Sequence, residues 1–302
     1  MKIITAEQIL NESHEMEFSV PLIIRDYSIS VTKTGSNYLV GTAHAKGDIP
    51  FKVWAGSTYE KMVGTDFKGK VCLVDLEVNS YQGAKSVIIK DIKETNADVS
   101  SLLSTPYNLE VNYENLEKKL KSNLSEGTFQ VWSSIMAKYG EHFKKEFAAI
   151  RYHDNVLGGL AAHTYKLVTL LDITLKMYPK IRKQFSKDVL FLGIALHDLG
   201  KIREYNMGTK SEFYFVDHTT FGVEMVSEFK GDLVETLGEE GYWKVVSIIS
   251  QHHGEWGTRP RSSEAYFIHC LDKFESSVQN LSDGMDKIEM GQPLYLDGFS
   301  LM

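Results

Sequence analysis

The hydrophobic pattern of this chain changes its period once, and this change constrains the fold more than any other feature. Between residues 21 and 94, apolar and polar residues alternate in short runs, which is the two-residue period of β-strands. From residue 108 onward, apolar residues recur every three or four positions, the period of amphipathic helices. A chain of 302 residues is long enough for two domains with separate cores. We therefore predict a β domain followed by an all-α domain.

The strand-like part contains five runs separated by turn residues and by one longer segment. The runs are PLIIRDYSISV (21–31), NYLVGTAHA (37–45), IPFKVWA (49–55), KVCLVDLEV (70–78) and KSVIIKDIKE (85–94). Residues 56–69 leave room for a short helix between the third and fourth runs. Five strands with a helix at this point is the order of an OB-fold barrel, which commonly binds single-stranded nucleic acid or oligosaccharide. Other small five-stranded barrels share the same pattern.

The change of period also predicts the domain boundaries. Residues 1–94 are expected to form the OB-like barrel, residues 95–150 a linker with connecting helices, and residues 151–302 a helical bundle. The linker begins with TNADVSSLLSTPY (95–107), which is small and polar. The predicted fold is thus a multidomain α and β protein.

Composition narrows the classes of function. The net charge is −7, and residues 151–302 contain 16 Lys and Arg against 21 Asp and Glu, unlike a protein that coats nucleic acid through a basic surface. Two cysteines, Cys72 and Cys270, cannot build a disulfide framework or a cysteine-based zinc site. The sequence contains no signal-peptide pattern and no stretch of about 18 uncharged apolar residues. We expect a cytoplasmic protein with no membrane partner.

Side chains that bind metals occur inside the apolar helical segments. In chain order they are His163, His197, Asp198, His218, His252, His253 and Asp272. Polar groups on a buried helix face need partners, and a shared metal centre would supply one for all of them. Imidazole nitrogens and carboxylate oxygens suit Zn, Fe, Mn, Co or Ni, and seven ligands exceed the needs of one ion. We predict two divalent metal ions bridged by Asp198, an arrangement that activates water for phosphoester hydrolysis.

The order of these residues resembles the signature of the HD-domain phosphohydrolases. The segments GGLAAHT (158–164), ALHDLGK (195–201), VDHTTFGVE (216–224) and SQHHG (250–254), followed by Asp272, match the order H…HD…H…HH…D. With an OB-like domain in front, the chain resembles the YhaM family of 3′-to-5′ exoribonucleases over most of its length. This resemblance implies a metal-dependent hydrolase, often using Mn, that trims single-stranded RNA or DNA from the 3′ end.

The resemblance also implies roles for individual residues. His163, His197, Asp198 and Asp272 match the ligands of the first metal, His218 and His252 match those of a second, and His253 is a ligand or supports one. Asp198 and Lys201 are the expected catalytic residues. Lys201 matches a lysine that lies beside the substrate phosphate. As a long side chain three residues after the metal motif, it also fits an ordinary surface lysine.

Nucleic-acid contacts are expected from four barrel side chains and one arginine. They are Tyr38, His44, Trp54, Tyr81 and Arg203. Aromatic rings bind bases by stacking, which contributes about 1–3 kcal/mol per base. The competing interpretation for each aromatic residue is packing inside the barrel.

The leading hypothesis is a 3′-5′ exonuclease in which the HD domain cleaves and the barrel holds the strand. An alternative is an HD-type nucleotide or cyclic nucleotide phosphohydrolase. Against it, residues 199–217 lack the GYP tripeptide that marks the HD-type cyclic dinucleotide phosphodiesterases. An alternative of another class is a non-catalytic nucleic-acid-binding adaptor, which has no need for seven polar groups in a helical core.

Overall fold

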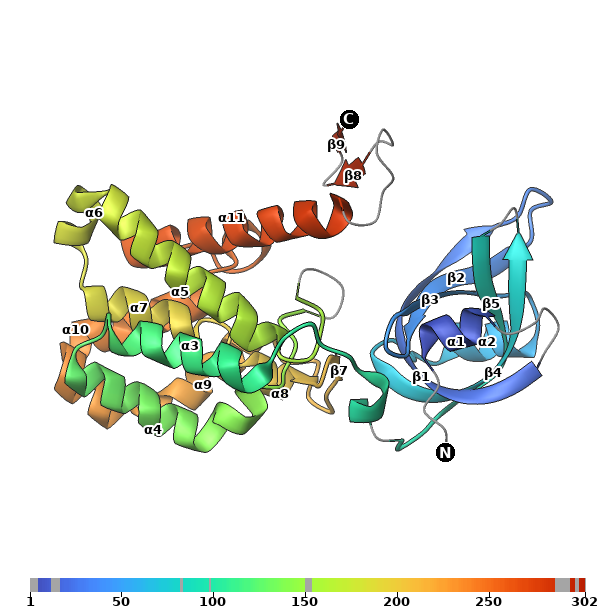
Figure 1. Ribbon diagram of the computed structural model, residues 1–302, viewed down its shortest axis with the longest axis horizontal. Helices are drawn as coiled ribbons and strands as arrows, with labels where there is room; N and C mark the ends of the chain where they lie inside the picture. The colour runs from blue at the N-terminus through green and yellow to red at the C-terminus, as the bar shows by residue number, and fades with distance from the viewer. Residues whose placement is uncertain are drawn as a thin grey trace. The chain divides into compact units, whose positions relative to one another are not determined.

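The computed structural model describes residues 5–11, 17–81, 84–97, 99–149, 154–285, 294–296 and 299–301. The chain forms two compact units (Figure 1). The first comprises Met1–Pro106 with Met207–Lys210, and the second Tyr107–Asn206 with Ser211–Met302. A closed five-stranded barrel is followed by a helical region, which confirms the predicted fold class.

The barrel is closed in the strand order β1-β2-β3-β5-β4. Its strands are β1 (Glu17–Val31), β2 (Asn37–His44), β3 (Asp48–Val53), β4 (Lys70–Tyr81) and β5 (Ala84–Glu94). Strand β1 pairs antiparallel with β2 and β4, while β3 and β5 pair in parallel. Helix α2 (Ser57–Gly64) lies between β3 and β4 in sequence, as predicted. Helix α1 (Ala6–Asn11) and the 3-10 helix η1 (Val99–Leu102) were not expected from the pattern.

Because apolar and polar residues alternate, the side chains on one face of each strand fill the barrel interior. Leu39, Phe51, Val74 and Ile92 are buried there. The β1–β2 register shifts near Asp26, and such bulges bend a strand as barrel closure requires.

The second unit is built from helices with small additions. The helices are α3 (Leu109–Lys121), α4 (Glu126–Phe143), α5 (Gly159–Met177), α6 (Pro179–Gln184), α7 (Lys187–Leu196), α8 (Lys201–Glu204), α9 (His218–Ser227), α10 (Lys230–Gln251), η2 (Gly254–Trp256) and α11 (Ser263–Met285). Its short strands are β6 (Tyr205–Asn206), β8 (Leu294–Leu296) and β9 (Phe299–Leu301), while β7 (Thr209–Lys210) belongs to the first unit. The sequence pattern did not reveal these four strands. None of the helices within the described ranges is long and apolar enough to cross a membrane.

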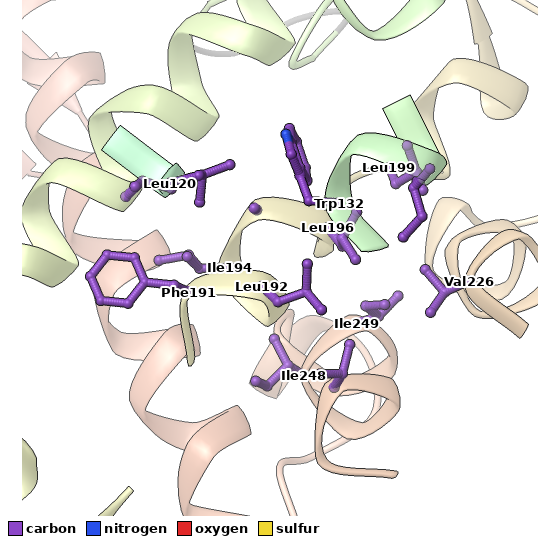
Figure 2. Close-up of a cluster of buried hydrophobic side chains, with 14 of the residues drawn as sticks. Leu120, Trp132, Phe191, Leu192, Ile194, Leu196, Leu199, Val226, Ile248 and Ile249 are labelled. Carbon is purple, nitrogen blue, oxygen red and sulfur yellow. The ribbon is translucent and has the colours of Figure 1, made fainter. Parts of the chain in front are cut away.

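Helix α7 forms the centre of the helical core. Its residues from Val189 to Leu196 are all buried, because a helix that is apolar on every side has no face to offer to water. Figure 2 shows α7 side chains among those of four other helices, with the labels Leu120 (α3), Trp132 (α4), Phe191, Leu192, Ile194 and Leu196 (α7), Val226 (α9), and Ile248 and Ile249 (α10). The residue that ends α7 is therefore placed deep inside the unit.

Candidate metal centre

The HD motif lies at the buried end of α7. His197 is the C-cap of the helix and is fully buried, and Asp198 follows in the turn that leads to α8. The helical period of the sequence runs across 188–205, which predicts one helix that includes both residues. The structure instead ends the helix at Leu196, and the backbone N–H of Leu199 bonds back to the Leu196 carbonyl.

Glycine at position 200 explains why this turn comes so close to α9. A Cβ atom at Gly200 would lie 1.9 Å from the carbonyl oxygen of His218 and 2.6 Å from the backbone nitrogen of Gly222. No other residue fits this contact without moving one of the two backbones. The glycine of the HDLGK segment thus allows His218 to approach Asp198.

The remaining predicted ligands come from four other elements. His163 lies near the start of α5, His218 is the first residue of α9, His252 is the C-cap of α10, His253 follows it, and Asp272 lies in α11. Asp217 caps α9 by accepting a hydrogen bond from the Thr219 N–H, which fixes the first turn that carries His218. Most of these side chains lie at helix ends, where several elements meet.

The two carboxylate oxygens of Asp198 face two groups of histidines. Oδ2 lies 3.3 Å from His197 Nε2 and 3.8 Å from His163 Nε2. Oδ1 lies 3.5 Å from His218 Nε2 and 3.5 Å from His252 Nε2. One carboxylate therefore borders both groups, as a bridging ligand would.

Asp272 and His253 extend these two groups. Asp272 Oδ1 lies 3.2 Å from His163 Nε2, and His253 Nε2 lies 3.0 Å from His218 Nε2. Candidate ligand atoms within 4.8 Å of one another form three overlapping sets: His163, His197 and Asp198; Asp198, His218, His252 and His253; and His197, His252 and Asp272. The structure thus brings all seven predicted ligands into one cluster.

Four histidines are oriented by hydrogen bonds on the side away from the centre. The Nδ1–H groups of His197 and His252 donate to the carbonyl oxygens of Ile194 and Ile249, at 2.7 and 2.9 Å. His163 Nδ1 lies 2.8 Å from Glu275 Oε2, and His218 Nδ1 lies 2.6 Å from Glu204 Oε2. A proton on each Nδ1 leaves the Nε2 lone pair directed at the centre, which is how metal-binding histidines are usually held.

Three buried atoms in the cluster have no hydrogen-bond partner within the described part of the chain. They are His197 Nε2, His252 Nε2 and Asp198 Oδ1. Buried polar atoms of this kind are costly unless something compensates them. Nitrogen and carboxylate donors that converge without protein partners fit a divalent metal ion.

The electrostatics of the cluster are strongly coupled. Burial alone would raise the pKa of Asp198, but His197 and Lys201 hold it well below its usual range. Burial would lower the pKa of His163, yet Asp272 and Glu275 raise it to about 10. Burial, together with His252 and His218, lowers the pKa of His253 to about 3. Metal binding at His163 would therefore displace a proton, whereas His253 is already neutral at pH 7.

A further acidic group beside His163 is better described as an ion-pair network. Asp154, His163 and Glu275 are close enough to hold a metal. However, Lys166 Nζ lies 2.8 Å from Asp154 Oδ2, 3.4 Å from Glu275 Oε1 and 2.7 Å from Gln279 Oε1. An ammonium group in this position competes with a cation, so we assign the group to supporting His163.

Removing either outer carboxylate should weaken metal binding without removing a ligand. We expect Glu275→Ala and Glu204→Ala each to lower metal affinity by about 10–100-fold, because His163 or His218 loses the acceptor that fixes its proton and ring orientation. Competition with a chromophoric chelator measures the affinity. Glu264→Ala is the matched control, since Glu264 is also buried but pairs with Lys244. Equal losses in all three variants would contradict a role specific to the histidines.

The other predicted residues of the helical unit differ in their surroundings. Lys201 Nζ lies 2.6 Å from Asp198 Oδ2 and its side chain is only 12% exposed, so it reaches the centre. Arg203 instead pairs with Glu224 at 2.7 Å, on a partly exposed surface.

The predicted barrel contacts also separate into distinct cases. Tyr38 and Trp54 lie together, with ring centroids 5.0 Å apart and Trp54 43% exposed. His44 is buried and its Nδ1 lies 2.8 Å from Asp48, so its ring is not presented for base stacking. The side chain of Tyr81, at the end of β4, lies outside the described residues.

Sequence reasoning missed Glu204, Glu275 and an aromatic run before His218. Glu204 and Glu275 look like ordinary polar residues of amphipathic helices. Phe213, Tyr214 and Phe215 are exposed, and Phe215 is 83% exposed only three residues before His218. Three consecutive aromatic residues next to a metal motif are the sequence feature from which this exposed segment could have been predicted.

Comparison with known proteins agrees with these observations. Residues 160–277 match the family described as HD domain. The chain is 27% identical over 289 residues to the 3′-5′ exoribonuclease YhaM of Oceanobacillus iheyensis, covering 91% of this chain and 89% of that protein. It is 26% identical over 290 residues to the protein of the same name from a Geobacillus species, covering 91% and 87%. The resemblance predicted from the ordered motif is thus confirmed, and it includes the barrel.

Proposed function

We propose that this chain, which carries an HD domain behind a closed five-stranded barrel, is a metal-dependent 3′-5′ exoribonuclease. The observation that carries the proposal is the convergence of seven histidine and aspartate side chains around Asp198. The similarity to proteins named 3′-5′ exoribonuclease, over about nine-tenths of the chain, supports the substrate and the direction of cleavage.

The ligands divide naturally into two sets that share Asp198. His163, His197 and Asp272 would hold one divalent ion, and His218, His252 and His253 a second. When bound, such ions lower the pKa of water and neutralise phosphate charge. Manganese is favoured by the family resemblance, and Fe, Co, Ni or Zn also suit these ligands.

The protein's own side chains supply the other requirements of hydrolysis. Lys201, held beside Asp198, would stabilise the negative charge that develops on the phosphate. The carboxylates of Glu204 and Glu275 keep His218 and His163 in the required tautomer. Phe213 and Phe215 would stack on bases near the 3′ end, because exposed rings offer a surface that every base can use.

The barrel would hold the strand through the Tyr38 and Trp54 pair. The two rings are close and Trp54 is exposed, while Lys52 Nζ lies 6.0 Å from the Trp54 ring centroid. An aromatic surface beside a cation is the usual composition of a site for single-stranded nucleic acid. His44 and Arg203 are not expected to contact the strand, because each already has a carboxylate partner.

Incubation with 5′-end-labelled single-stranded RNA and Mn²⁺ tests the proposed activity directly. We expect a ladder that shortens from the 3′ end and nucleoside monophosphates as products, with no products after chelation. Matched single-stranded DNA and duplex RNA arms define the substrate class. Hydrolysis of free nucleotides without degradation of RNA would favour a nucleotide phosphohydrolase. Binding of RNA without any hydrolysis, under all five metals named above, would favour an adaptor.

Metal stoichiometry provides a separate test of the ligand assignment. We expect about two equivalents of divalent metal per chain after loading and desalting, because the ligand set exceeds one coordination sphere. Elemental analysis by mass spectrometry measures this number. Less than one equivalent at saturating Mn, Fe, Co, Ni or Zn would refute the assignment of the ligands.

A further inference from the structure

A polar pocket lies in the helical unit, away from the metal centre. Its volume is about 260 Å³, and it is lined by Ser122, Asn123, Asp172, Leu175, Lys176, Arg182, Lys187 and Phe191. Asp172 lies nine residues after His163 in α5, and Lys187 lies ten residues before His197 in α7. At a rise of 1.5 Å per residue, these spacings put the pocket roughly 14–15 Å from the centre along both helices.

The pocket contains more positive than negative charge. Three cations, Lys176, Arg182 and Lys187, line it together with one carboxylate, Asp172. That carboxylate is already paired, because Asp172 Oδ2 lies 2.6 Å from Lys119 Nζ and 2.9 Å from Lys176 Nζ. Within the residues that the structure describes, neither Arg182 nor Lys187 forms a salt bridge.

Among the described residues, Lys187 forms no salt bridge with the carboxylate that follows it in the chain. Asp188 is its neighbour in sequence, but the Asp188 oxygens accept hydrogen bonds from the Ser125 N–H and the Thr128 hydroxyl at the start of α4, each at 2.9 Å. Lys187 Nζ lies over the Phe191 ring, 5.5 Å from its centroid. Burial and then the positive charge of Arg182 lower the pKa of Lys187, and the opposing effects of Asp172 and Asp188 do not offset them.

We propose that this pocket binds a phosphate ester group. Arg182 offers a planar fork of donors that matches phosphate oxygens, and Lys187 adds a point charge. The polar side chains of Ser122 and Asn123 and the apolar walls of Leu175 and Phe191 leave room for the organic part of a small ester. Positive charge concentrated in a hollow of an otherwise acidic unit attracts anions selectively.

Calorimetric titration of the metal-loaded, full-length protein tests this assignment. The probes are inorganic phosphate, adenosine 5′-monophosphate and a short single-stranded RNA with a non-hydrolysable backbone. The pocket variant is Arg182→Gln with Lys187→Gln. The control is Lys180→Gln with Lys183→Gln. It removes two exposed cations from α6, the helix that carries Arg182, and neither of them lines the pocket.

We expect the pocket variant to lose one phosphate-binding event, with affinity at least about tenfold weaker, while the control keeps it. A charge-preserving Arg182→Lys variant should retain part of the binding. The affinity lost in the pocket variant, compared with wild type, identifies the ligand: a larger loss for the monophosphate identifies a free ester, and a larger loss for RNA identifies a backbone phosphate. Identical isotherms for wild type and pocket variant would overturn the proposal.

Loss of phosphate binding at this pocket can be distinguished from loss of the proposed nuclease activity. Hydrolysis of bis-p-nitrophenyl phosphate should be unchanged in the pocket variant, because none of the residues that line the pocket is among the candidate metal ligands. Circular dichroism establishes that the variant is folded.

Discussion

Replacing Asp198 with asparagine should abolish hydrolysis while RNA binding stays measurable. The substitution keeps the shape of the side chain but removes its charge. An NH2 group replaces one of the two carboxylate oxygens, which face His197 and His252. Loss of a group that both ligand sets share should lower kcat by on the order of 10³-fold or more. RNA affinity should change little, since the barrel pair of half-buried Tyr38 and exposed Trp54 is untouched.

The measurement is kcat on labelled RNA, with metal content and circular dichroism determined on the same samples. Glu264→Gln is the control for neutralising a buried carboxylate, because Glu264 pairs with Lys244 and is in none of the metal clusters. Lys201→Ala should be milder, about 10–100-fold, since it removes a donor to the phosphate and no ligand. A folded Asp198→Asn protein with near wild-type cleavage would disprove the mechanism.

Removing the Tyr38 and Trp54 ring pair of the barrel should raise KM for long RNA and leave small-ester hydrolysis unchanged. At about 1–3 kcal/mol per stacked base, the Tyr38→Ala, Trp54→Ala double variant should raise KM for a strand of about 30 nucleotides by about 10–100-fold. The effect should fall on KM because contacts remote from the scissile bond stabilise ground and transition states alike. Bis-p-nitrophenyl phosphate contains no polynucleotide strand for these rings to hold.

Steady-state kinetics on both substrates measures the two effects. Trp243→Ala is the matched control, because Trp243 is similarly exposed, at 51%, but belongs to α10 of the helical unit. An unchanged KM for RNA in the barrel variant would argue that the barrel binds another protein instead of the strand.

The sequence predicted the barrel well because strand alternation is a local property. Each run shows by its own period which residues face inward, and the segment 56–69 was the only one long enough for a helix. Helix α1 and the two-residue strands escaped prediction because they are too short to show a period. The break after Leu196 escaped because it depends on the contact between Gly200 and the His218 carbonyl, which lies in a distant part of the sequence.

The metal centre likewise combines features that a local sequence pattern reveals with contacts that form only on folding. Histidines in apolar segments are conspicuous, and the order of the motif identified all seven residues that the structure brings together. Glu204 and Glu275 were missed because a glutamate on an amphipathic helix normally faces water. Whether Arg203 and His44 were free to bind nucleic acid could not be read from the sequence, since Glu224 and Asp48 are paired with them only in the folded chain.

The burial of α7 has a consequence for how the centre persists over time. Amides in a helix that is enclosed on every side exchange with solvent mainly through global unfolding, whereas surface helices open locally. His197 is attached to the end of this helix, and its ring is tied to the Ile194 carbonyl within it. The ligand geometry around His197 should therefore last as long as the native state itself, and an ion should enter or leave by side-chain movement rather than by helix opening.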